Sequence, residues 1–191
     1  MGRYKYQKVP TPWLRKGAVE PKSKPTGWEP CSPHNNSASI KALIDATPMF
    51  KAPLNYTNFT PLTFKLDRPA PMPGYMGEEV LEIHGNRVNW TEAAEWMAFL
   101  YMPEAEWHTS VSCPEWLGVL GNIPHIGQNP AMKDTMIWRV GLRQKLKDLK
   151  QRHARQIVVT LAGPTGGPPG PGAPPDQPFM LTSAKIVYQK S

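Results

Sequence analysis

The stretch NPAMKDTMIWRVGLRQKLKDLKQRHAR, residues 129–155, contains the longest uninterrupted apolar pattern of the chain. Asn129 can cap a helix, and Met132, Met136 and Val140 then recur every four residues. An adjoining apolar strip holds Trp138, Leu142, Leu146 and Leu149. This pattern predicts one long amphipathic helix that lies on the core of the protein.

The end of this stretch is strongly basic. Its basic residues are Arg143, Lys145, Lys147, Lys150, Arg152 and Arg155, and Asp148 is the acid among them. Cations near the C-terminus of a helix interact favourably with the helix dipole, so this cluster can be an ordinary solvated helix end. The alternative is a patch for an acidic partner, whether protein, RNA phosphate or anionic lipid. Lys145, Lys147, Lys150 and Arg152 are therefore candidate partner-binding residues.

The composition indicates one domain with irregular extensions. The chain has 191 residues, of which 23 are proline, so regular structure cannot run throughout it. The net charge of +7 is moderate for a protein that binds RNA through much of its surface. Seven Trp and nine Met favour protein interfaces, where large apolar side chains serve as anchors.

The N-terminal segment combines basic and aromatic residues with several prolines, which prevent a long helix. Such a segment buries too little apolar surface to fold alone, so we expect it to lie along a partner. Its candidate partner-binding residues are Arg3, Tyr4, Lys5, Tyr6, Lys8, Trp13, Arg15, Lys16 and Trp28. We expect residues 1–77 to form an extended arm that wraps partners.

The remaining residues, 78–191, predict a small α+β domain. Its core is expected at about residues 78–162 and 179–190, with a Gly/Pro-rich loop at 163–178 and little regular structure in 1–77. Helices are predicted at 39–46, 90–102, 129–155 and, as short starts, at 103–108 and 113–120. Strands are predicted at 62–66, at 80–83 before a turn at 84–87, and as a pair at 157–161 and 181–188.

Two cysteine–histidine pairs are the best metal candidate. Cys31 and His34 are three residues apart, and His108 precedes Cys113 by five. Two thiolates and two imidazoles suit tetrahedral zinc, but neither pair has the context of a zinc finger. A buried thiol with surface histidines is the alternative, and we assign no metal.

The sequence contains no motif that commits it to catalysis. Glu78, Glu79 and Glu82 form an acidic cluster beside a predicted strand, and such clusters are usually solvated edges. The Gly/Pro-rich loop lacks the Gly-Lys-Ser/Thr of a phosphate-binding loop. We therefore predict no catalytic residues, no cofactor and no enzymatic activity.

These observations favour a non-catalytic accessory subunit of a large assembly that contacts several protein subunits. We favour a mitochondrial energy-transducing complex, of the respiratory chain or ATP synthase, because the N-terminus is acid-poor and the positive charge only moderate. No apolar run reaches the ~20 residues of a membrane span, so the subunit would be peripheral to the inner membrane. The alternatives are a ribosomal or mitoribosomal RNA-binding protein and a microtubule-associated protein of the ciliary axoneme.

Overall fold

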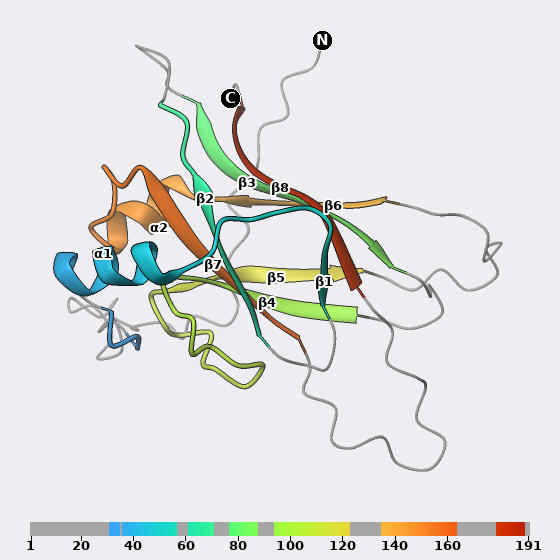
Figure 1. The fold of residues 1–191 in the computed structure, drawn as a ribbon, viewed down its shortest axis with the longest axis horizontal. Coiled ribbons are helices and arrows are strands. Elements are labelled where there is room, and N and C mark those ends of the chain that lie inside the picture. Colours follow the sequence, from blue (N-terminus) through green and yellow to red (C-terminus); the bar gives the residue numbers. More distant parts are fainter. Residues whose placement is uncertain are drawn as a thin grey trace, which may run out of the picture.

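Two antiparallel β-sheets lie face to face in the computed structural model of the chain (Figure 1). The described residues are 31–34, 36–56, 61–70, 77–87, 94–122, 135–163 and 179–189. Sheet A has the strand order β2 (Leu62–Asp67), β7 (Gln156–Ala162), β4 (Ala94–Leu100) and β5 (Trp116–Asn122). Sheet B has the order β1 (Leu54–Tyr56), β8 (Phe179–Gln189), β3 (Glu78–Arg87) and β6 (Thr135–Gly141).

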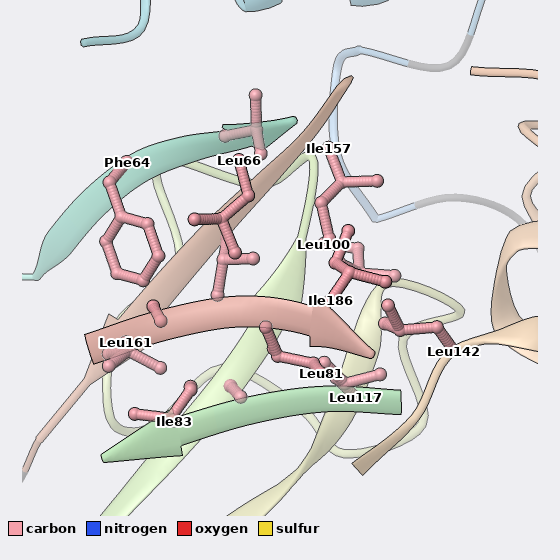
Figure 2. Packing of buried hydrophobic residues seen from close by; sticks show 14 of the residues in the cluster. Phe64, Leu66, Leu81, Ile83, Leu100, Leu117, Leu142, Ile157, Leu161 and Ile186 are labelled. Atoms are coloured by element: carbon pink, nitrogen blue, oxygen red, sulfur yellow. The ribbon is translucent and has the colours of Figure 1, made fainter. Parts of the chain in front are cut away.

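The main core lies between the two sheets. Alternate side chains of each strand point inward, as the two-residue period of a strand requires, and Leu81 and Ile83 of β3 face the interior of the sandwich. Figure 2 shows Phe64, Leu66 and Leu161 of sheet A in the same cluster. Burial of each such side chain stabilises the fold by roughly 2 to 3 kcal/mol, so this cluster accounts for the sandwich.

The outer face of sheet A is covered by two further segments. One is the helix α1 (Ser37–Ala46), which packs against β7, and Lys65 of β2 donates from Nζ to the carbonyl oxygen of Ile44 (2.8 Å). The other is residues 101–115, which we call the cover loop. Strand β7 is therefore buried on both faces. Its sequence, QIVVTLA, is accordingly a nearly continuous apolar run and does not alternate between apolar and polar residues.

The stretch 129–155 does not form the long helix that its four-residue spacing predicts. Within its described part, residues 135–141 form β6 and only Arg143–Asp148 form a helix, α2. Trp138 lies opposite Ile83 of β3 and is buried, whereas the neighbouring Ile137 is half exposed. Large β-branched and aromatic residues that alternate between core and solvent favour a strand, and this pattern outweighs the helical one.

The predicted helices at 90–102 and 113–120 are also wrong, because both regions contribute strands to sheet A. Strand β4 has Ala98 and Leu100 in the main core and Phe99 in a second cluster on the outer face. A strand that is buried on both faces loses its alternation and resembles a buried helix in sequence. Residues 103–108 lie in the cover loop, as turns.

Several shorter predictions are confirmed. The helix at 39–46 corresponds to α1, and the strands at 62–66, 80–83, 157–161 and 181–188 correspond to β2, β3, β7 and β8. However, β3 continues through the expected turn to Arg87, and β7 and β8 lie in different sheets instead of pairing.

The fold class is therefore not α+β but mostly β, a sandwich of two antiparallel sheets. The core also begins earlier than residue 78, because α1, β1 and β2 belong to it. Most of the Gly/Pro-rich loop, residues 164–178, lies outside the described residues. In the described part of the chain, no helix has the length and apolar character to cross a membrane.

Candidate functional site

A disulfide bond closes the cover loop onto the segment that precedes α1. It joins Cys31 and Cys113, whose Cα atoms lie 5.5 Å apart across 82 residues of sequence. Cys31 is exposed, whereas Cys113 is buried. The disulfide thus ties the two segments that lie on the outer side of sheet A to each other.

A buried carboxylate supports this disulfide. Glu115 accepts hydrogen bonds from the N–H groups of Cys31 (3.2 Å) and Ser32 (3.3 Å). One of its oxygens and the two sulfur atoms all lie within 4.8 Å of one another. Glu115 therefore places a negative charge beside the disulfide and holds the backbone of the Cys31 segment.

Tyr101 anchors the start of the cover loop. Its phenol donates to the carbonyl oxygen of Gln156 (3.1 Å), and its own carbonyl accepts from the hydroxyl of Ser32 (3.0 Å). Burial raises the pKa of the Tyr101 phenol above its ordinary value. Tyr101 also has a positive φ of 54°, which is uncommon for a bulky residue and indicates that its surroundings hold it in place.

Beneath the cover loop lies a small apolar cluster, which we call the apolar pad. It consists of Phe99, Met102, Ala105 and Ala162, and all four are buried. Met97 and Trp116 pack against its edge. Two of the four members belong to the loop itself, so the pad is closed only while the loop stays in position.

The four candidate zinc ligands do not come together. Cys31 and Cys113 are bonded to each other, so neither offers a thiolate, and the expected buried thiol is wrong as well. The histidines face carboxylates instead: Nε2 of His34 lies 4.0 Å from Glu104, and Nε2 of His108 lies 3.1 Å from Glu106. Among the described residues, the one group of three potential ligands is Cys31, Cys113 and Glu115.

The predicted acidic cluster is divided between two environments. Glu79 is buried and pairs with Arg68, which donates from Nη2 to Oε2 (2.7 Å) and from Nε to Oε1. The hydrogen bond from Arg68 to Glu79 raises the pKa of the arginine above its ordinary value. Glu78, the first residue of β3, is exposed.

Glu82 is the centre of a charged network on the outer face of sheet B, which we call the Glu82 network. It contacts Nε2 of His84 (2.8 Å), Nε of Arg139 (2.8 Å) and Nζ of Lys185 (3.2 Å). The hydrogen bonds from His84 and then Arg139 lower the pKa of Glu82 to about 2. The three partners come from β3, β6 and β8, so this network links the strands of the sheet.

The candidate partner-binding residues of the basic stretch differ in their surroundings. Lys145 donates from Nζ to the carbonyl oxygen of Pro114 (3.2 Å) and lies 5.9 Å from the ring centroid of Trp116, and burial lowers its pKa. Lys147, Lys150 and Arg152 are exposed. The candidates of the N-terminal arm, Arg3 to Trp28, lie outside the described residues.

Sequence reasoning missed the roles of Arg68 and Glu115. Arg68 follows a strand and stands among prolines, and Glu115 follows Cys113-Pro114, which suggests a helix start. The one available indication of a disulfide was that the chain contains two cysteines and no third. A single pair in a chain of this length fits a free thiol equally well.

Comparison with known families identifies this domain. A model of the family described as Chloroplastic Polyphenol Oxidase C-terminal domain matches residues 64–169, more than half of the chain. The chain therefore belongs to this family of C-terminal domains. No curated protein sequence matches it significantly.

Solved structures share the fold. The recombinantly expressed latent aurone synthase, a polyphenol oxidase, matches with a TM-score of 0.55 and 20% identity, over 75% of this chain and 27% of that one. The latent apple tyrosinase matches with a TM-score of 0.53 and 17% identity, over 75% of this chain and 29% of that one. The chain thus spans less than a third of these oxidases, and at such identities the similarity shows the fold alone.

These comparisons correct the functional predictions. The accessory subunit of a respiratory-chain or ATP synthase complex is wrong, because the family is a domain of polyphenol oxidases. The prediction of no enzymatic activity is contradicted as well, because the family belongs to an enzyme family. The family is described as chloroplastic, which contradicts the mitochondrion and equally the cilium and the ribosome.

Proposed function

We propose that the chain acts as the C-terminal domain of a polyphenol oxidase, which binds the catalytic part of that enzyme and keeps it latent. The observation that carries this proposal is the family match over residues 64–169. It is supported by the matched structures, which are of latent oxidases and are more than three times as long as the matched part. We extend the proposal to location and place the protein in the chloroplast, on the family's description.

The structure supplies a rigid body that suits such a role. Its two sheets enclose one large apolar core, and the disulfide and α1 close the outer face of sheet A. A rigid domain loses little conformational entropy when it docks, so a modest interface is sufficient to hold it.

We propose that the exposed basic end of α2 contributes to docking. Lys147, Lys150 and Arg152 are exposed, and Asp148 is the acid in this part of the chain. Such a patch would speed association with an acidic surface of the catalytic part and make it dependent on salt. This retains the interpretation of the basic stretch as a partner contact, with an oxidase in place of a mitochondrial complex.

Binding to an identified partner tests the proposal. The full chain is mixed with the catalytic part of a polyphenol oxidase from the same source, and the affinity is measured by calorimetry. We expect a one-to-one complex that weakens about tenfold or more in Lys147→Glu/Lys150→Glu. The matched control, Lys41→Glu/Lys51→Glu, has the same change of charge at exposed positions outside α2 and should bind normally. A chain that shows no binding at high concentration would overturn the proposal.

A further inference from the structure

We propose that the Cys31–Cys113 disulfide is a redox-controlled latch, which a dithiol reductant opens by attacking Cys31 and whose opening separates the cover loop, with Met102 and Ala105, from Phe99 and Ala162 of sheet A. The latch is a property of this chain alone. It does not depend on the proposed function.

The two sulfur atoms differ in access, and this difference sets the direction of attack. Cys31 is exposed, whereas Cys113 is only 3% exposed. The thiolate of an incoming dithiol therefore bonds to Sγ of Cys31, and the bond between Cys31 and Cys113 breaks. Cys113 takes the electron pair and leaves as a thiolate, which a proton from solvent neutralises.

The second thiol of the reductant completes the reaction. It attacks the mixed disulfide, releases Cys31 as a thiol and leaves the reductant as a disulfide. Two electrons and two protons pass from the dithiol to the protein, so the exchange is balanced. A monothiol lacks this second internal step, and the latch is expected to respond to dithiols much more readily.

Glu115 controls how easily the latch opens. Its carboxylate oxygen lies within 4.8 Å of both sulfur atoms. A negative charge at this distance disfavours the leaving thiolate of Cys113, and thiols that leave with difficulty slow the exchange. Glu115 is therefore a positioning residue that restrains reduction, and it also holds the backbone of Cys31 through the hydrogen bond described above.

The two ends of the cover loop are held by backbone hydrogen bonds, from Tyr101 to Val158 (3.0 Å) and from Leu100 to Glu115 (2.8 Å), whereas its middle has few contacts besides the disulfide. Between residues 102 and 113, Met102, Ala105 and Cys113 are the buried side chains, and the others are exposed or half-buried. The loop's own backbone hydrogen bonds, such as Ala105 to Met102 (3.1 Å) and Cys113 to Ser110 (3.1 Å), are local turns. Local opening of such a segment needs far less free energy than unfolding of the sheets.

The latch has a consequence for latency, and this consequence rests on the proposed function. In a C-terminal domain, the catalytic part precedes the domain in the chain, so the connection passes through Cys31. Reduction would remove the covalent link between this connection and the cover loop and leave the hydrogen bonds of Ser32 to Glu115 and Tyr101 to hold it. The oxidised form would keep it fixed against the domain.

Hydrogen exchange of the full chain, measured by mass spectrometry with and without dithiothreitol, tests the latch. We expect amides in the middle of the cover loop, including those of Ala105, Thr109 and Cys113, to exchange about tenfold or more faster after reduction. Peptides of β3 and β8 in sheet B should keep their protection and serve as the internal control. Unchanged exchange in the loop, or an equal loss of protection in both sheets, would show a purely structural crosslink and overturn the proposal.

Two variants test separately whether the faster exchange comes from loss of the disulfide and whether Glu115 restrains its reduction. The Cys31→Ser/Cys113→Ser variant should show the open pattern of exchange without any reductant. Glu115→Gln keeps the size of the side chain but removes its charge, and we expect dithiothreitol to reduce this variant about threefold or more faster than the wild type. An equal or slower rate in Glu115→Gln would contradict the role of Glu115. Neither measurement needs an oxidase, so failure of the latch and failure of the proposed function are distinguishable.

Discussion

Arg68 and Glu79 form a buried ion pair that joins the two sheets of the sandwich. Arg68 directly follows β2 of sheet A, and Glu79 lies in β3 of sheet B. The remaining donors of Arg68 reach the carbonyl oxygens of Arg152 (2.6 Å) and Ala154 (3.1 Å), before β7. One guanidinium therefore holds the ends of three segments together.

Removal of the Arg68 guanidinium should strongly lower the free energy of unfolding. Arg68→Met leaves the Glu79 carboxylate buried without its counter-charge, and such a loss destabilises a protein by about 3 to 5 kcal/mol. Arg139→Met is the matched control, because its side chain is half exposed and His84 and Lys185 remain beside Glu82. We expect a loss of about 1 kcal/mol or less there. Urea denaturation measures both, and equal effects would contradict a special role for Arg68.

The Glu82 network makes the stability depend on pH. The pKa of Glu82 falls from its ordinary value of 4.5 to about 2 in the folded protein. The unfolded chain thus binds more protons between these values, and the contribution of Glu82 is complete above pH 4.5 and lost as the pH falls towards 2. In Glu82→Gln this contribution is absent. We expect the unfolding free energies of variant and wild type to differ at pH 6 and to converge near pH 2; a constant difference would contradict the assignment.

Lys150 occupies a position that favours glycine. It has φ of 58° just after α2, and the N–H of Gln151 donates to Leu146 (2.7 Å) while that of Lys150 donates to Lys147 (3.1 Å), as in a Schellman motif. Lys150→Gly should therefore stabilise the protein by about 1 kcal/mol. Lys147→Gly removes the same charge inside the helix and should destabilise it by about 1 kcal/mol. Opposite shifts of the denaturation midpoint support this geometry, and two shifts of the same sign contradict it.

Neighbouring substitutions in β6 test the strand directly. Trp138 is buried against Trp96, with ring centroids 6.0 Å apart, whereas Ile137 is 48% exposed. Trp138→Ala should cost about 3 to 5 kcal/mol, and Ile137→Ala should cost less than about 1 kcal/mol. Thermal denaturation of the two variants provides the comparison. Similar losses at both positions would contradict the alternation of a strand.

The limits of the sequence are clearest in β4 and β6. The sequence around each of these strands is apolar enough for a helix. Whether it forms a helix or a strand depends on which neighbouring segments cover each of its faces. The cover loop buries Phe99 on the outer face of sheet A, so an apolar residue is needed there as well as on the inner face. The local spacing of residues in the sequence does not show where that loop lies. Short segments with a clear local pattern were predicted correctly: α1 has the Asn36–Ser39 capping box, and β2 alternates between the core and the surface.

The site was less predictable than the fold. The sequence pattern pairs Cys31 with His34 and Cys113 with His108, and nothing local indicates a bond between two cysteines that 82 residues separate. Glu82 was identified within an acidic cluster, yet its partners Arg139 and Lys185 lie in strands that follow much later in the chain. Contacts of this kind depend on strand order, which the sequence pattern does not contain.

Inhibition of an oxidase by the chain is the most direct test of the proposed function. The catalytic part of a polyphenol oxidase from the same source is freed of its own C-terminal domain, and its oxidation of a diphenol is measured with increasing amounts of the full chain. We expect a saturable loss of activity that reaches at least about tenfold, and a return of activity when Lys147→Glu/Lys150→Glu replaces the wild type. Full oxidase activity in the presence of a large excess of the wild-type chain would contradict it.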